Sequence, residues 1–158
     1  MTVPAIGQTV ADFTAQATSG KTVSLSEAKG KPEVIYFYPK DSTPGCTQEG
    51  QDFRDLYSEF TKLGAEIFGI SRDSLKSHEN FKCKQSFPFE LISDADEILC
   101  RLFDVIKLKN LYGKQVEGIV RSTFLIDREG RLVREWRKVS VKGHAEKVLE
   151  ALRELANA

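Results

Sequence analysis

Three short runs of β-branched and aromatic residues constrain the fold of this chain more than any other feature. They cover residues 33–39 (EVIYFYP), 65–71 (AEIFGIS) and 122–127 (STFLID). Runs of this length and composition are typical of strands that are covered on both faces of a sheet. Between the first two runs, apolar residues recur every three or four positions over 47–63, which predicts a helix. A strand, a helix and a second strand in this order predict parallel strands.

Three further helical patterns supply the flanking layers. Residues 74–86 and 95–103 have helical spacing, and residues 143–158 carry an apolar stripe on one side. The stripe predicts that the last helix packs on the sheet.

Turn residues predict two antiparallel hairpins. Residues 127–130 (DREG) separate the third strand from an alternating run, RLVREW, that returns beside it. Ser19-Gly20 marks a smaller hairpin within residues 11–25. Residues 107–118 (KLKNLYGKQVEG) form the most irregular internal stretch, and we expect a surface loop there.

The predicted fold is α/β and thioredoxin-like, with a mixed central sheet flanked by helices and an N-terminal β-hairpin extension. A length of 158 residues fits one domain of ordinary size, and neither a repeat nor a linker divides the chain. We therefore expect residues 1–158 to form a single domain.

Charge and apolar content exclude several classes of function. The 23 basic and 23 acidic residues cancel, so no global field favours nucleic acid, and the basic stretch 131–144 is interpreted as a solvated strand face. The N-terminus lacks a signal-peptide pattern, and no run of about 18 apolar residues would span a membrane. These features predict a cytoplasmic protein that binds neither nucleic acid nor membrane.

The cysteines are predicted to be reactive rather than structural. Cys46, Cys83 and Cys100 form an odd set in a chain too large to depend on disulfides, which indicates a reducing compartment. No C-x-x-C pair occurs, because Gln48 and Glu49 stand where a second thiol would be needed. Dithiol exchange of the thioredoxin type is therefore not expected.

The sequence TPGCT is typical of a helix start. Thr43 is the predicted N-cap, Pro44 takes the first helical position and Cys46 takes the third. Unpaired backbone N–H groups and the positive end of the helix dipole favour the thiolate there over the thiol. The alternative for Cys46 is the common fate of a free cysteine, a small buried apolar residue.

Arg121 is the candidate cation for this thiolate. It lies just before the third predicted strand, and a planar guanidinium can hold both a thiolate and a polar oxygen. Thr43 offers a hydroxyl three positions before Cys46. The alternative for Arg121 is a solvated arginine at the end of a strand.

The stretch YFYPKDSTPGCT resembles the active-site signature of the peroxiredoxins, with Pro39, Thr43 and Cys46 in the spacing P-x-x-x-T-x-x-C. The residues YPKDSTPGCT are similar to the signature of the peroxiredoxin Q branch, whose members are also called bacterioferritin comigratory proteins. The segments FGISRDS, FPFELISD and RSTFLID follow in that family's order. The resemblance therefore covers nearly the whole chain.

The resemblance implies a thiol peroxidase with a thioredoxin-like fold. Cys46 would be the peroxidatic cysteine, which attacks the O–O bond of a peroxide and becomes a sulfenic acid. Pro39 would shield the site, Thr43 would hydrogen-bond the peroxide, and Arg121 would stabilise thiolate and substrate. Glu49 matches a carboxylate that orients the arginine in many relatives; the alternative is a plain exposed glutamate on the helix.

The resemblance also implies a second thiol that converts the sulfenic acid to a disulfide and protects it from overoxidation. One subgroup carries this resolving cysteine five residues after the peroxidatic one, where this chain has Gln51. Another subgroup carries it in the next crossover helix, where Cys83 lies. The implied Cys46–Cys83 disulfide requires local unwinding, because the two thiols belong to separate helices. Cys100 is predicted to be a partly buried packing residue.

No bound cofactor or metal is implied. His78, Cys83 and His144 lack the close ligand pairs of a zinc site, and both histidines are predicted to be solvated. The implied partners are a hydroperoxide and thioredoxin or a similar dithiol, and the branch indicates a monomer. Two alternatives stay open: a one-cysteine peroxidase that an external thiol resolves, and a thiol redox sensor or holdase.

Overall fold

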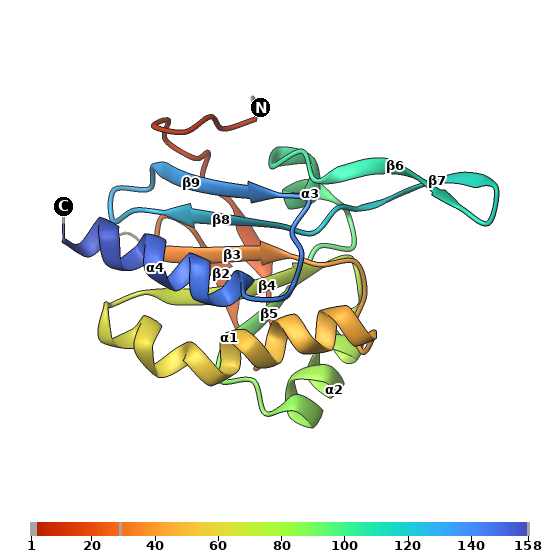
Figure 1. Cartoon of the computed structure of the whole chain (residues 1–158), viewed down its shortest axis with the longest axis horizontal. Helices are drawn as coiled ribbons and strands as arrows, with labels where there is room; N and C mark the ends of the chain where they lie inside the picture. Colours follow the sequence, from red (N-terminus) through yellow and green to blue (C-terminus); the bar gives the residue numbers. More distant parts are fainter. Residues whose placement is uncertain (1–2, 29, 158) are drawn as a thin grey trace.

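A mixed five-stranded sheet forms the centre of the protein (Figure 1). The computed structural model describes residues 3–28 and 30–157. The strands of this sheet are β3 (Glu33–Phe37), β4 (Glu66–Ser71), β5 (Glu90–Ser93), β8 (Ser122–Ile126) and β9 (Leu132–Arg137). Their order is β5-β4-β3-β8-β9, in which β3, β4 and β5 run parallel, whereas β8 runs antiparallel to both of its neighbours. The predicted strands and the predicted return strand are thus confirmed.

Helices and loops bury both faces of this sheet. On one face α1 and α4 lie side by side, with α2 below α1 in the view of Figure 1. Side chains of β3 alternate: Val34 and Tyr36 join the apolar cluster under α1 and α4, whereas Ile35 and Phe37 join the opposite cluster. None of the helices in the described residues is long and apolar enough to cross a bilayer. The helices are α1 (Pro44–Lys62), α2 (Leu75–Gln85), α3 (Ile98–Leu102) and α4 (His144–Ala156).

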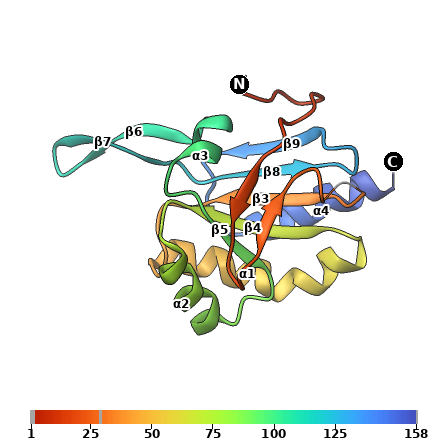
Figure 2. The same ribbon diagram turned by 180° about the vertical axis from the view of Figure 1, so that it is seen from behind.

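Two hairpins stand outside the central sheet (Figures 1 and 2). The predicted N-terminal hairpin consists of β1 (Thr14–Gln16) and β2 (Thr22–Ser24). The prediction of a loop at residues 107–118 is wrong. Instead β6 (Ile106–Leu111) and β7 (Lys114–Ile119) pair antiparallel and form an arm that projects from the body.

The sequence pattern does not predict the two strands of the arm, because most of their side chains face solvent. Leu108 is 66% exposed and Val116 is 40% exposed. Beyond the base of the arm, the side chains that the structure describes are exposed or half-buried, so they form no buried face that would impose an apolar alternation. The remaining signal is its turn, where Tyr112 and Gly113 both have positive φ, at 52° and 77°. A two-residue hairpin turn with this geometry matches the right-handed twist of the flanking strands.

Helix α3 is shorter than the pattern at residues 95–103 predicts. Glu97, immediately before the helix, has a left-handed backbone with φ of 62°. The Asp94 carboxylate accepts the N–H groups of Leu99 and Cys100 at 3.0 and 2.7 Å. These side-chain bonds replace a preceding helical turn, so the helix begins only after Glu97.

Gly50 allows α1 to approach Phe87, just beyond α2. A Cβ at Gly50 would lie 2.3 Å from Cζ of the buried Phe87 ring. Overpacking a core costs about 1–3 kcal/mol, whereas alanine gains about 1 kcal/mol over glycine in a helix. Because this contact is so short, we expect Gly50→Ala to lower the free energy of unfolding by about 2 kcal/mol in urea titrations.

The matched control for this prediction is Gln48→Ala, at an exposed position of the same helix. It should change the free energy of unfolding by less than about 0.5 kcal/mol. A Gly50→Ala protein as stable as the wild type would mean that α1 does not pack this closely on Phe87.

Candidate active site

Cys46 lies in the first turn of α1, as predicted. Thr43 precedes the helix with an extended backbone and accepts the N–H of Thr47 through its carbonyl at 2.9 Å. Its hydroxyl does not cap the helix, because it donates to the Lys40 carbonyl at 2.8 Å. Cys46 is 2% exposed, so it is buried as the alternative interpretation expected. A cation nevertheless reaches its sulfur.

Arg121 is that cation, and it connects Cys46 to Glu49. Its Nη2 donates to Cys46 Sγ at 3.5 Å, and its Nη1 donates to Glu49 Oε1 at 2.6 Å. The Arg121 side chain is 16% exposed and that of Glu49 is 1% exposed, so the alternatives of a solvated arginine and an exposed glutamate are wrong. Glu49 follows Cys46 by three residues and shares its helix face. The two contacts together fix the plane of the guanidinium.

The charge of Glu49 depends on its surroundings. Burial raises the pKa of Glu49 to about 7, although the Arg121 guanidinium acts to lower it. Among the described residues, no group hydrogen-bonds its second oxygen, Oε2. Glu49 therefore exchanges a proton near neutral pH, and Arg121 faces a full carboxylate only at higher pH.

Lys109, in the arm, brings a second cation to this neighbourhood, and sequence analysis missed it. The side chain is half-buried, and its Nζ donates to the carbonyl of Ile119, two residues before Arg121. Burial lowers the pKa of Lys109, and the positive charges of Arg121 and Arg72 lower it further. Only recognition of the hairpin would have placed Lys109 beside the strand that leads to Arg121.

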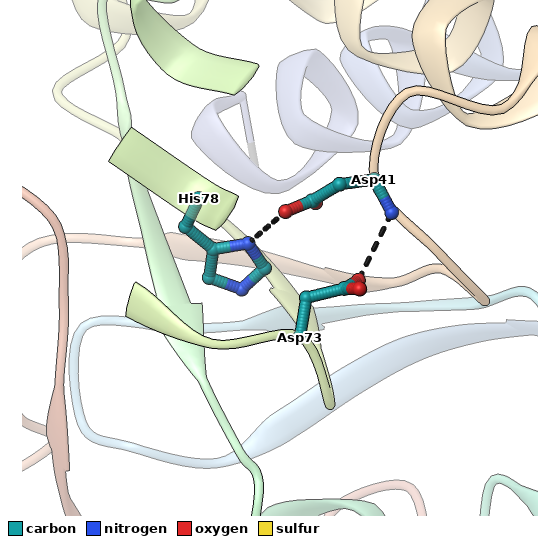
Figure 3. Close-up of side chains that lie close together, drawn as sticks. All are labelled: Asp41, Asp73 and His78. Carbon is teal, nitrogen blue, oxygen red and sulfur yellow. Dashed lines mark hydrogen bonds and ion pairs between the residues drawn. The ribbon is translucent and has the colours of Figure 1, made fainter. Parts of the chain in front are cut away.

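Asp41 and His78 form a buried pair beside the loop between β3 and α1 (Figure 3). His78 Nδ1 lies 2.7 Å from Asp41 Oδ2, and its Nε2 donates to the Ile92 carbonyl at 2.9 Å. The prediction of a solvated His78 is wrong, since its side chain is 0% exposed. Its spacing of three residues from Phe81, which is also buried, is the sequence signal that was overlooked.

The pair belongs to a larger network. Asp41 also accepts the hydroxyls of Tyr38 and Ser77, at 2.6 and 2.7 Å, and its N–H donates to Asp73 Oδ2 at 2.9 Å. One ligand atom each of Asp41, Asp73 and His78 lies within 4.8 Å of the others, the spacing of a metal site. These side chains come from three segments (Figure 3), where His78 meets the Asp41 carboxylate and the backbone N–H of Asp41 donates to the Asp73 carboxylate. Hydrogen bonds from protein groups therefore hold both carboxylates in place.

His144 is buried as well, which corrects the prediction that it is solvated. It is the first residue of α4, and its Nε2 lies 2.7 Å from Thr123 Oγ1. Burial lowers the pKa of His144 to about 4, so the ring is neutral at physiological pH. Its role is to join α4 to the central strand β8.

The three cysteines are free and differ in exposure. Cys46 is buried on α1, Cys83 is exposed on α2, and Cys100 is 0% exposed on α3. Burial raises the pKa of the Cys100 thiol far above its usual range, and the neighbouring Asp94 raises it further. Cys100 thus packs in the core as predicted, but is fully rather than partly buried. Cys83 is the exposed thiol.

Comparisons with known proteins identify the family. Residues 6–135 match the AhpC/TSA family. Peroxiredoxin Bcp of Xanthomonas campestris is 60% identical over 142 residues, which cover 90% of this chain and 89% of that protein. This chain belongs to the peroxiredoxins, in the Bcp/PrxQ branch. Peroxiredoxin Bcp of Bacillus subtilis is 51% identical over 151 residues, 96% of each chain.

Solved structures place this peroxiredoxin in the predicted thioredoxin-like fold. The bacterioferritin comigratory protein of Xanthomonas campestris matches with a TM-score of 0.88 and 58% identity, over 91% of this chain and 92% of that chain. A PrxQ variant from Xylella fastidiosa matches with a TM-score of 0.92 and 45% identity, over 97% and 98%. This peroxiredoxin is a thiol peroxidase, so it consumes a peroxide and a thiol reductant.

Glu49→Gln is expected to flatten one limb of the pH profile of peroxide reduction. As the pH falls through about 7, Glu49 takes up a proton and holds Arg121 less firmly, so the wild-type rate falls. Above that pH the variant should be about tenfold slower, the equivalent of about 1.4 kcal/mol lost from a charged hydrogen bond. The check is the single-turnover rate from pH 5 to 9. An identical limb in both proteins would assign it to another group.

Proposed function

We propose that Cys46 is the peroxidatic cysteine of this peroxiredoxin and Cys83 its resolving cysteine. Cys46 Sγ attacks one oxygen of a hydroperoxide: an S–O bond forms, the O–O bond breaks, and the leaving oxygen takes a proton to become water or an alcohol. Sulfur is oxidised to the sulfenic acid and the peroxide is reduced. The observation that carries the proposal is the contact of Arg121 with both Cys46 and Glu49.

Arg121 has two tasks in this step. Its positive charge stabilises the thiolate before the attack, and its remaining donors can stabilise the charge that develops on the leaving oxygen. The Thr43 hydroxyl, now bonded to the Lys40 carbonyl, would turn to the bound peroxide. Pro39, half-buried two residues beyond the end of β3, would shield the site from water.

Cys83 completes the cycle by condensation. Its thiol attacks the sulfenic sulfur of Cys46, an S–S bond forms, and the sulfenic oxygen leaves as water. Because Cys46 is buried on α1 and Cys83 is exposed on α2, the first turn of α1 and part of α2 must unwind. We therefore expect faster amide hydrogen exchange at residues 44–49 in the oxidised protein than in the reduced protein.

The substrates and partners of the proposal extend beyond hydrogen peroxide. The Xanthomonas relative is described for its alkyl peroxide reduction activity, so organic hydroperoxides are included. The expected reductant is thioredoxin or a similar dithiol, which would reduce the disulfide by exchange. We expect the enzyme to act as a monomer in the cytoplasm, where a reducing poise keeps its thiols free.

The two thiols can be compared within one scaffold. Cys83→Ser leaves Cys46 to react, and Cys46→Ser leaves Cys83 as an exposed thiol without the arginine. Under pseudo-first-order conditions, Cys46 should react with hydrogen peroxide at least about 1,000-fold faster than Cys83, because only Cys46 has oriented donors. Similar slow rates for both thiols would support the redox sensor or holdase instead.

A further inference from the structure

The pair formed by Asp41 and His78 ties together the two segments that must move. Asp41 lies in the loop before the Cys46 turn, and His78 lies in the first turns of the Cys83 helix. We propose that this pair is a positioning anchor: it stays closed while the segments beyond it unwind, and so it holds Cys46 and Cys83 within reach of each other. The inference rests on the proposed pairing of these cysteines.

The hydrogen bonds of the pair make it hard to open. His78 Nε2 faces a carbonyl, which only accepts, so that nitrogen carries a proton, and a second proton lies between Nδ1 and Asp41 Oδ2. Asp41 accepts from Tyr38 and Ser77 as well. The side chains are 0% and 3% exposed. Separating the pair would leave buried polar atoms without hydrogen-bond partners, which strongly disfavours opening at this point.

The other end of α2, before the buried Phe87, is held by more exposed contacts. Arg54 Nη1 donates to the Gln85 carbonyl at 2.8 Å, and Gln51 donates to the Gln85 side chain at 2.9 Å, both only partly buried. Ser86, which ends the helix, has a left-handed backbone with φ of 56°, a strained conformation for a non-glycine residue. Unwinding of α2 is therefore expected to begin at this end and to proceed back toward His78, releasing Cys83 on the way.

Spacing along the chain supports the anchor. Cys46 follows Asp41 by five residues, and Cys83 follows His78 by five residues. An extended chain spans at most about 3.6 Å per residue, so each thiol moves on a tether of at most about 18 Å from a fixed point. Without the pair, the next tie between the two segments is the bond from the Tyr38 N–H to the Ile70 carbonyl at 3.0 Å. A loop of about 10 residues closes more readily than the loop of about 21 residues through that bond, and the length dependence amounts to roughly threefold.

The test measures the resolution step directly, in the full chain. One equivalent of hydrogen peroxide is added, samples are quenched over time, and intact mass separates the sulfenic form from the disulfide. His78→Gln should form the disulfide at least about threefold more slowly than the wild type. Glu79→Ala is the matched control: Glu79 is exposed on the same helix and bonds only the Ser19 N–H in the described structure. The rate of disulfide formation in Glu79→Ala should stay within about twofold of the wild-type rate.

An unchanged or faster resolution rate in His78→Gln would overturn the anchor, since a faster rate would make the pair an obstacle to unwinding. Hydrogen exchange of the wild type supplies a second readout that needs no variant. In the oxidised protein, the Ser77 and His78 amides should stay protected while those of residues 82–86 exchange. Loss of protection at Ser77 and His78 would also overturn it. Absence of any Cys46–Cys83 disulfide in the wild type would instead contradict the proposed function.

Discussion

Arg121→Lys should lower the rate constant of Cys46 with hydrogen peroxide by about 100-fold or more, the loss typical when one preorganised donor to a developing anion is removed. The guanidinium holds Cys46 Sγ and Glu49 Oε1 with two different nitrogens, at 3.5 and 2.6 Å. A lysine ammonium is a single point charge on a flexible stem, so it cannot keep both contacts in one plane. The measurement is a stopped-flow single turnover at pH 8, where Glu49 is charged.

The control for Arg121→Lys is Arg134→Lys. Arg134 also pairs with a glutamate, Glu154 at 3.4 Å, but on the exposed surface. Exposed pairs contribute little, so this variant should react at the wild-type rate. If Arg121→Lys were as fast as Arg134→Lys, positive charge alone would suffice and the bridging geometry would have no part in the reaction.

Cys83→Ser separates the two chemical steps most sharply. The exposed Cys83 lies on α2 and does not contact the site around Arg121, so the first reaction with peroxide should stay within about twofold of the wild type. Sustained turnover with thioredoxin and its reductase should fall by about 100-fold or more, because no internal thiol removes the sulfenic acid. Continued exposure to peroxide should then drive Cys46 to the sulfinic acid.

The one-cysteine alternative makes the opposite prediction for this variant. If an external thiol resolves Cys46 directly, the thioredoxin-coupled rate of Cys83→Ser equals that of the wild type. Cys100→Ser is the matched control, since Cys100 is fully buried in the core and takes part in neither proposed step. It should leave both rates unchanged, although the protein can lose some stability.

Sequence reasoning succeeded where burial imposes a pattern. Strands β3 and β8 are buried at every position, so their composition alone predicts them, and TPGCT predicts the turn that carries Cys46. β5 was not among the predicted strands, because it is only four residues long and its apolar residues do not alternate. The β6–β7 arm is largely exposed, and nothing in an exposed hairpin except its turn constrains the sequence.

The site residues also differ in whether a local sequence pattern predicts them. Thr43 and Cys46 could be proposed from the local spacing of one motif, and Arg121 from its charge before a predicted strand and from the family resemblance. The burial of Glu49 could not, since it is a polar residue on a helix whose environment depends on distant segments. Only the folded chain shows that His78 meets Asp41 and that Arg121 covers Glu49.

The most direct test of the central claim is the mass of the protein before and after one equivalent of hydrogen peroxide, followed by peptide mapping. A disulfide removes two hydrogens, so the account predicts a loss of about 2 Da, a Cys46–Cys83 linkage and a free Cys100. A stable gain of one oxygen on Cys46, with Cys83 still free, would contradict it, because no thiol of this chain would then resolve the sulfenic acid.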